Sequence, residues 1–249
     1  MIKKRIDQLL VEKQLVETRT KAKAMIMAGQ IFVDEKQIQK SGEMFKEDVI
    51  ISIKNLQPEW VSRGAFKILH ALNIFNIKIN NKTCLDLGAS TGGFSQVLLK
   101  KGAIKIYSVD VGKNQLHEKL RIENKIINIE KTNARYLTSA TIKDKIDIIV
   151  CDVSFISMKK VIQPCLKFLT NNGKIIALIK PQFEVKKNEI KKGVVLDKNV
   201  HLRICDEYKK WFEENCLMKF VGLVESPIKG PKGNKEFLIY CQNYKNLKQ

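Results

Sequence analysis

No stretch of the sequence approaches the ~18 to 20 consecutive apolar residues that a membrane-crossing helix needs. The first residues, MIKKRIDQLL, are not followed by the apolar stretch and small-residue cleavage site of a secretory signal. The six cysteines form no C-x-x-C pair, and those in apolar runs such as IIVCDV are expected to be buried, reduced thiols. We therefore predict a cytoplasmic protein that does not enter a membrane.

Histidine is scarce as well. The three histidines, His70, His117 and His201, lie far apart in the sequence and form no H-x-x-x-H pair. A structural or catalytic zinc site is therefore not expected, and we predict that the protein binds no metal.

Acidic residues are few relative to basic ones, with 26 Asp and Glu against 45 Lys and Arg, which gives a net charge of +19. A chain this basic is attracted to polyanions through counterion release, which favours a nucleic-acid partner. The preference for Lys over Arg leaves base-composition drift open as an alternative cause. Residues 1–60 hold 11 basic and 9 acidic residues, so residues 61–249 carry +17 of the excess.

The N-terminal part has the pattern of a small module. Apolar spacing predicts helices over 3–13 and 18–28, after which Gly29 ends the second helix and short strands follow in IFVDEKQIQK and DVIISI. The segment NLQPEWVSRG has no periodicity and is typical of a connection. We predict a first domain over 1–58 and a linker over 59–62.

From residue 63 to 249 helices and strands alternate. Helices are predicted at 64–73, 92–101, 157–169 and 198–215. Strands are predicted in TCLDLG, IKIYSVDV, IINIE, IDIIVCDV, KIIALIK, MKFVGLVESPI and EFLIYCQN, the last two as an antiparallel hairpin. Near-continuous apolar strands between helices indicate an α/β fold of the Rossmann-like type, with a seven-stranded, mostly parallel sheet covered on both faces.

The stretch LDLGASTGGFSQVLL places an acid at the end of a buried strand, followed by a glycine-rich turn and a helix. Such a turn lets the backbone approach a ligand and offers free N–H groups to a carboxylate or phosphate. Dinucleotides, flavins and S-adenosylmethionine all use turns of this kind, and plain packing can also explain the glycines. The spacing G-x-x-x-G-G, with Asp86 two residues before Gly88, favours S-adenosylmethionine.

Two polar residues follow the next two strands. Asp110 ends the strand IYSVDVG, where an acid can accept hydrogen bonds from both ribose hydroxyls of a bound nucleoside. Asn133, in EKTNAR, could meet the adenine edge, and a loop-capping role is an equal alternative.

Four charged residues suggest a reaction. Asp152 and Lys180 are predicted at the carboxyl ends of buried strands, where open α/β sheets place their active sites. With Lys67 and Glu236 they form a set that could stabilise an alkoxide, because a sugar hydroxyl that attacks a methyl group needs a cation nearby. Each alone could be a solvated charge at the end of a strand.

These motifs closely resemble the TlyA or "hemolysin A" type of rRNA ribose 2′-O-methyltransferase, related to the FtsJ methyltransferases. The family's Lys-Asp-Lys-Glu tetrad matches Lys67, Asp152, Lys180 and Glu236, with Lys180 expected to activate the 2′-hydroxyl and Glu236 to position the sugar. TGG replaces the PGG of the FtsJ relatives, which a backbone cradle tolerates. The resemblance implies an S-adenosylmethionine site made of Asp86, Gly88, Ala89, Ser90, Gly92, Gly93, Phe94, Asp110, Val111, Asn133 and Ala134.

The first 55 residues resemble the αL RNA-binding domain of a small-subunit ribosomal protein, pseudouridine synthases and tyrosyl-tRNA synthetases. The motif positions are Arg5, Asp7, Arg19, Ala22, Gly29 and Val33. The resemblance implies that Arg5 and the second helix, with Arg19, Lys21 and Lys23, contact RNA phosphate. Arg63, one helical turn before Lys67, is predicted to contact phosphate as well.

The family pattern implies ribosomal RNA or a ribosomal subunit as partner and a cytidine of large-subunit rRNA as target, because the short termini match the shorter TlyA class. A non-catalytic RNA-binding protein and a membrane-lytic protein are the alternatives. The intact tetrad argues against the first, and the lack of a strongly amphipathic basic helix against the second. A pseudouridine synthase would match only the N-terminal module. The oligomeric state stays open.

Overall fold

A computed structural model describes residues 3–27, 29–54 and 60–243. The chain divides into two compact units, 1–59 and 60–249, each described here by itself. Residue 28, at the end of the second predicted helix, lies outside the described residues, as do residues 55–59, which include the start of the predicted linker.

The N-terminal unit combines two helices with two small antiparallel sheets. Its elements are β1 (Lys3–Arg5), α1 (Ile6–Glu12), α2 (Arg19–Met27), β2 (Ile31–Val33), β3 (Lys36–Gln37), β4 (Met44–Lys46) and β5 (Ile51–Ile53). The strands pair as β1–β4 and as β3–β2–β5. Both helices pack on β2 through fully buried side chains such as Ile6, Leu10 and Ile26.

The first predicted helix begins three residues too early. Lys3–Arg5 form a strand because their backbone pairs with Met44–Lys46, a partner about 40 residues away that helical periodicity cannot reveal. Arg5 keeps extended backbone angles at the start of α1.

The second unit contains the seven-stranded sheet. Its helices and strands are α3 (Gly64–Ile74), β6 (Thr83–Leu87), α4 (Gly93–Lys100), β7 (Lys105–Val109), α5 (Glu118–Arg121), β8 (Ile126–Ile129), β9 (Ile146–Cys151), α6 (Met158–Ile162), β10 (Leu169–Ile179), α7 (Lys198–Glu214), β11 (Met218–Glu225) and β12 (Phe237–Asn243). The strand order is β11-β12-β10-β9-β6-β7-β8, with β12 antiparallel to both neighbours. This mixed, mostly parallel sheet confirms the predicted Rossmann-like class.

The predicted helix over 157–169 is wrong in its second half. α6 ends at Ile162, and a 3₁₀ segment, Gln163–Phe168, replaces the helix. Pro164 explains the change, since a proline lacks the N–H that the α-helical ladder requires. Further 3₁₀ turns are Ala134–Tyr136, Pro181–Phe183, Lys187–Glu189 and Pro231–Gly233.

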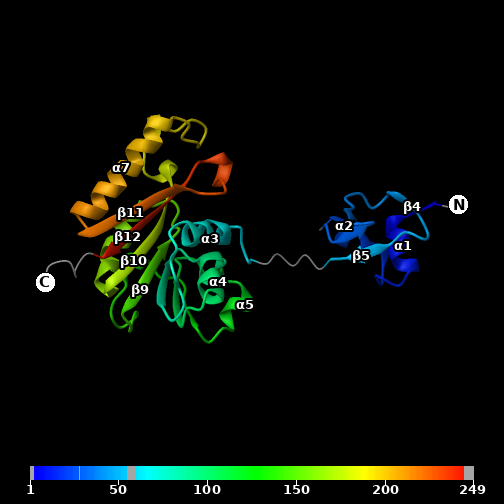
Figure 1. Cartoon of the computed structure of the whole chain (residues 1–249), viewed down its shortest axis with the longest axis horizontal. Coiled ribbons are helices and arrows are strands. Elements are labelled where there is room, and N and C mark those ends of the chain that lie inside the picture. The colour runs from blue at the N-terminus through cyan, green and yellow to red at the C-terminus, as the bar shows by residue number, and fades with distance from the viewer. Residues whose placement is uncertain (1–2, 28, 55–59, 244–249) are drawn as a thin grey trace. The chain divides into compact units, whose positions relative to one another are not determined.

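Helices cover both faces of the sheet (Figure 1). One face packs against α6 and α7 through buried side chains such as Met158 and Phe212. The other packs against α3 and α4, where Ile68 and Val97 are fully buried.

The sheet register brings four chain segments to one edge. Leu87 pairs with Cys151 across β6 and β9, and Ile179, at the end of β10, pairs with Phe237, the first residue of β12. Because β12 runs antiparallel, its start lies at the carboxyl ends of the parallel strands. Residues 88, 152, 180 and 236 therefore leave the sheet at the same edge.

Candidate active site

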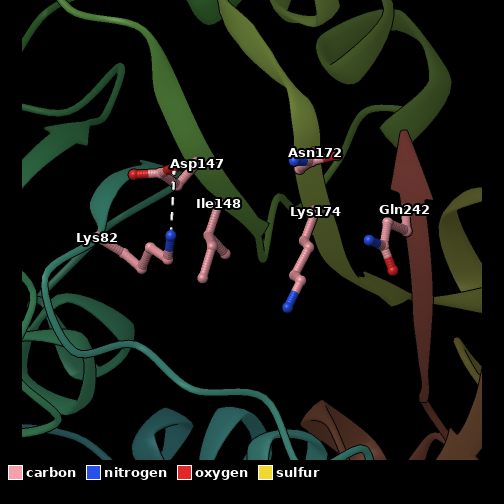
Figure 2. A pocket seen from close by; sticks show the side chains of 6 residues that line it. All are labelled: Lys82, Asp147, Ile148, Asn172, Lys174 and Gln242. Atoms are coloured by element: carbon pink, nitrogen blue, oxygen red, sulfur yellow. Dashed lines mark ion pairs between the residues drawn. The ribbon is translucent and has the colours of Figure 1, made fainter. Parts of the chain in front are cut away.

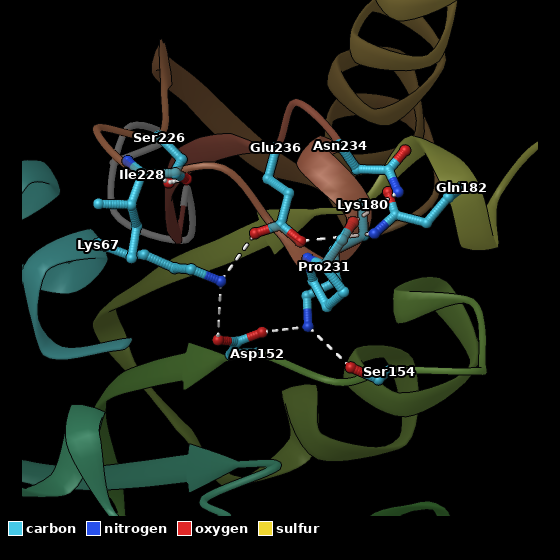
Figure 3. A network of polar contacts seen from close by, with 10 residues as sticks. All are labelled: Lys67, Asp152, Ser154, Lys180, Gln182, Ser226, Ile228, Pro231, Asn234 and Glu236. Atoms are coloured by element: carbon cyan, nitrogen blue, oxygen red, sulfur yellow. Dashed lines mark hydrogen bonds and ion pairs between the residues drawn. The ribbon is translucent and has the colours of Figure 1, made fainter. Parts of the chain in front are cut away.

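Four charged side chains from distant parts of the chain meet at this edge (Figure 3). Lys67 Nζ lies 2.7 Å from Glu236 Oε2 and 3.6 Å from Asp152 Oδ2. Lys180 Nζ forms an ion pair with Asp152 Oδ1 and donates a hydrogen bond of 2.9 Å to Ser154 Oγ. A continuous polar chain thus runs from Glu236 through the two lysines and Asp152 to Ser154.

The network is largely shielded from water. The side chains of Lys67 and Lys180 are each 8% exposed, and that of Glu236 is fully buried. Buried charges are costly unless they are paired. Here two ammonium groups face two carboxylates, so the charges balance, and Asp152 contacts both lysines.

Three supporting residues were not predicted. Gln182 Nε2 donates to Glu236 Oε1 at 3.4 Å, and a Cβ added at Gly230 would lie 2.1 Å from that oxygen. Gly230 therefore leaves the space that Glu236 fills. Ser154 could have been found from its place two residues after Asp152, whereas the other two contacts depend on loops that the sequence does not place.

The glycine-rich turn between β6 and α4 runs beside this network. Gly88 has a φ of +81°, and a Cβ there would lie 2.8 Å from the carbonyl oxygen of Asp152. Gly92 has a φ of +94°, and its Cβ would lie 2.3 Å from Leu120 Cδ1. Glycine alone adopts such angles at low cost and also permits this close approach.

Asp110 follows β7 on the other side of the turn. Its Oδ2 accepts a hydrogen bond of 2.8 Å from Ser90 N, and its Oδ1 accepts one of 2.7 Å from Gly112 N. Asn133 Oδ1 accepts from Arg135 N at 3.1 Å, so Asn133 caps the 3₁₀ turn that follows. Backbone contacts therefore fix the orientation of both side chains.

Two adjoining cavities lie over the turn. The larger, of about 480 Å³, is lined by the predicted residues Gly88, Ser90, Asp110, Val111, Asn133 and Ala134. The smaller, of about 270 Å³, is lined by the predicted residues Arg63, Lys67, Gly88, Ala89, Ser90, Gly93, Phe94, Asp152 and Lys180. The cavities share Gly88, Ser90, Asp152 and Ser154, so they meet where the glycine turn adjoins the charged network.

Known proteins resemble the chain over nearly its whole length. Residues 60–243 match the FtsJ-like methyltransferase family, and residues 4–51 match the S4 domain. The 16S/23S rRNA (cytidine-2′-O)-methyltransferase TlyA of Mycobacterium tuberculosis is 35% identical over 240 residues, which cover 96% of this chain and 89% of the relative. The chain belongs to the TlyA family of FtsJ-like methyltransferases.

Two further relatives agree with the TlyA assignment. The 23S rRNA (cytidine-2′-O)-methyltransferase TlyA of Campylobacter jejuni is 35% identical over 257 residues, with 92% of this chain and 96% of the relative covered. A solved structure from Streptococcus thermophilus is 35% identical, has a TM-score of 0.73, and covers 98% of this chain and 89% of its own.

The TlyA-family chain is an S-adenosylmethionine-dependent methyltransferase, and its cavities fit that cofactor. Gly88 lines both cavities, and the turn can pass this close to the carbonyl oxygen of Asp152 only because Gly88 has no Cβ. Asp110 lines the larger cavity, and Lys67, Asp152 and Lys180 of the tetrad line the smaller one.

Two predicted cofactor residues line neither cavity. Gly92 lies against Leu120, and Asp86 is fully buried beneath the start of α4. Asp86 Oδ2 accepts a hydrogen bond of 2.6 Å from Ser95 Oγ, while its Oδ1 has no hydrogen-bond partner. Burial raises the pKa of this carboxyl to about 7. Asp86 thus supports the turn from below.

Three of the four residues predicted to contact RNA in the N-terminal unit form ion pairs with acidic side chains. Arg5 and Arg19 both pair with the buried Asp7, whereas Lys21 pairs with the exposed Glu17 at 3.2 Å. Lys23 is exposed on α2.

A further cavity of about 270 Å³ lies at the opposite edge of the sheet (Figure 2). Its lining residues are Lys82, Asp147, Ile148, Asn172, Lys174 and Gln242. Asp147 pairs with Lys82 at 3.7 Å and accepts from Thr83 N at 3.0 Å, so its carboxylate is used in joining β6 and β9. No predicted site residue lies there.

Within residues 3–27, 29–54 and 60–243, no group of three or more His, Cys, Asp or Glu side chains could hold a metal ion. In the same part of the chain, no helix is long and apolar enough to cross a membrane.

Proposed function

We propose that this enzyme methylates the ribose 2′-hydroxyl of a cytidine in ribosomal RNA, with the large subunit as its target and the cytoplasm as its location. The names of the two TlyA relatives support the cytidine and the ribosomal substrate, and both names include 23S rRNA. The observation that carries the proposal is the position of Lys180, buried in a balanced network where the two cavities meet.

The chemistry requires alignment and charge stabilisation. When bound, S-adenosylmethionine supplies an electrophilic methyl group. An ammonium has three N–H donors; Ser154 accepts one from Lys180, and Asp152 Oδ1 is the ion-pair partner of the same group. We assign a further N–H of Lys180 to the ribose 2′-oxygen, which Lys180 aligns and whose developing negative charge it stabilises while the hydroxyl proton is released to solvent.

The other tetrad residues control Lys180. Asp152 holds the Lys180 ammonium in place and contacts Lys67 on its other oxygen. Glu236 was expected to position the sugar, but its buried side chain contacts Lys67 and Gln182. We therefore assign it to holding Lys67, and through Lys67 to fixing Asp152.

The N-terminal S4 unit supplies the contacts that select the RNA. We assign phosphate contacts to Arg5, Arg19, Lys21 and Lys23, and a contact beside the active site to Arg63, which lines the smaller cavity. The charge of +17 beyond residue 60 adds attraction that is independent of sequence.

Mass mapping of ribose methylation in rRNA from cells with and without the gene tests the proposal. We expect one cytidine of large-subunit rRNA to lose its methyl group and purified enzyme to restore it. A modification confined to small-subunit rRNA would overturn the choice of subunit. Unchanged rRNA, together with leakage of liposomes by detergent-free protein, would favour the membrane-lytic alternative.

A deletion tests the role of the S4 unit. A chain lacking residues 1–55 should bind S-adenosylmethionine normally, because the cavities lie wholly within residues 60–249. It should not methylate ribosomal substrate. Full activity of the shortened chain would show that the unit is dispensable.

A further inference from the structure

Asp7, at the start of α1, is completely buried, and its carboxylate pairs with two cationic side chains instead of one. Its Oδ1 accepts from Arg5 Nε at 3.0 Å, and its Oδ2 accepts from Arg5 Nη2 at 3.2 Å and from Arg19 Nη2 at 3.0 Å. One carboxylate therefore holds two guanidinium groups, which come from β1 and α2.

The cluster has an excess positive charge. Two guanidinium groups and one carboxylate leave a net charge of +1, and the two arginine side chains are 41% and 48% exposed. Lys4, in contrast, lies 2.8 Å from both Glu12 and Glu47. Among the described residues, neither arginine forms an ion pair with a second acid.

The two arginines keep N–H groups for a ligand. Arg5 uses Nε and Nη2 on Asp7, and Arg19 uses Nη2. Arg5 Nη1 lies over Gly42, where a Cβ would come within 3.2 Å of it. Because guanidinium groups cannot lose their charge in proteins and hold planar, forked donors, they suit a phosphate that carries one negative charge.

We propose that Asp7 is a positioning residue that holds Arg5 and Arg19 together as a clamp for one RNA phosphate group. A phosphate diester would supply the single negative charge that the cluster lacks. Asp7 reduces the loss of side-chain freedom on binding, because it orients both arginines before RNA arrives. This inference rests on the proposed function in that it takes the partner to be RNA.

The ionisation of Asp7 agrees with this role. Hydrogen bonds from Arg5, assisted by those from Arg19, hold the pKa of the Asp7 carboxyl below its usual value. The carboxylate therefore stays charged at neutral pH and keeps both arginines in place.

Two variants that each raise the net charge by one distinguish a positioning role of Asp7 from a simple effect of net charge. Asp7→Asn removes the buried carboxylate, and Glu17→Gln, the matched control, removes the exposed acid beside Lys21. If charge alone decides, both variants bind RNA more tightly. If Asp7 positions the arginines, Asp7→Asn binds at least ~5-fold more weakly, while Glu17→Gln binds as well as wild type or slightly better.

The measurement is fluorescence anisotropy with the full chain and a labelled large-subunit rRNA transcript, over a range of salt concentrations. Equal or tighter binding by Asp7→Asn would overturn the proposal. Hydrogen exchange of the N-terminal unit checks folding, since weaker binding by an unfolded variant would not count.

A second variant does not depend on the folding of Asp7→Asn. Arg19→Lys keeps the charge and loses the planar fork, at a side chain that is half exposed. We expect ~3-fold or greater loss of RNA affinity with an unchanged salt slope. The matched control is Arg203→Lys in α7, whose arginine pairs with two glutamates, and it should bind normally. Unchanged affinity of Arg19→Lys would refute the clamp.

The outcome also separates this proposal from the proposed function. If wild-type enzyme leaves rRNA unmethylated, the proposed function fails whatever Asp7 does. If wild type methylates rRNA while Asp7→Asn and Arg19→Lys bind it normally, only the clamp fails.

Discussion

Asp7 and Asp86 are both completely buried, one in each unit, and they are stabilised in opposite ways. Two arginines hold Asp7, and their hydrogen bonds lower its pKa. Asp86 accepts a hydrogen bond from the Ser95 hydroxyl on Oδ2 and has no partner on Oδ1, and burial raises its pKa to about 7. Whether a buried acid is charged thus depends on its partners more than on its depth.

The tetrad lies between these two cases. Asp152 contacts Lys67 and Lys180, as Asp7 contacts two arginines, but Glu236 balances the second cation. The Asp7 cluster therefore carries an excess positive charge, while the two cations of the tetrad are balanced by two carboxylates.

Lys180→Ala should have the largest effect, because it removes the cation that we assign to the ribose oxygen. The single-turnover rate of rRNA methylation should fall by at least ~100-fold, the usual scale for an oxyanion donor or a general acid or base. Rapid-quench assays with excess enzyme measure this rate. Binding of S-adenosylmethionine and RNA should persist.

The control for this variant is Lys210→Ala, which removes an exposed lysine of α7. It should leave the rate within two-fold of wild type. If Lys180→Ala also stays within a few-fold of wild type, the assignment is wrong and Lys67 becomes the candidate.

Asp110→Ala should have the next largest effect. Asp110 is already oriented by Ser90 N and Gly112 N, so its loss removes a preorganised acceptor for ribose hydroxyls. Affinity for S-adenosylmethionine, measured by calorimetry, should fall at least ~10-fold, because hydrogen bonds to charged groups contribute ~1.5 to 3 kcal/mol. Asp206→Ala, an exposed acid of α7, is the control. Equal affinity in both variants would remove Asp110 from the cofactor site.

The sequence predicts those arrangements whose residues lie close together along the chain. The strands, the glycine turn and the positions of Asp152 and Lys180 could be predicted, since each is written in one short stretch. The β1–β4 pairing could not, because its partners are about 40 residues apart. The same holds for Asp7: its place in the S4 motif was visible, but its two arginines come together only in the fold.

Asp86→Asn should have a moderate effect on stability with a defined pH dependence. A folded-state pKa raised to about 7 from 3.8 means that the native state binds the extra proton, so wild-type stability falls as pH rises from about 4 to about 7. Asparagine cannot ionise. At pH 8 the free energy of unfolding of the variant should exceed that of wild type by about 1 kcal/mol, once the cost of burying the amide N–H groups is included. The variant should therefore unfold at a higher denaturant concentration.

The difference between Asp86→Asn and wild type should shrink to zero or reverse at pH 4, where both side chains are neutral. Tryptophan fluorescence without cofactor reports this unit alone, because the chain's two tryptophans, Trp60 and Trp211, both belong to residues 60–249. A difference that is the same at pH 4 and pH 8 would mean that Asp86 is ionised in the folded enzyme.

Asp7→Asn should have the smallest effect on stability, and with the opposite pH dependence. A lowered folded-state pKa means that Asp7 stabilises the native state above the unfolded value of about 3.8, and that this stabilisation is lost as pH falls through the folded value. The effect is small because Arg5 and Arg19 are half exposed and water screens their charges. The measurement is hydrogen exchange of α1 peptides, corrected for intrinsic rates. Protection should be lower in the variant than in wild type at pH 6, and the two should converge below pH 4. If the variant instead becomes more protected at pH 6, the two arginines do not stabilise the Asp7 carboxylate, and its burial destabilises the fold as that of Asp86 does.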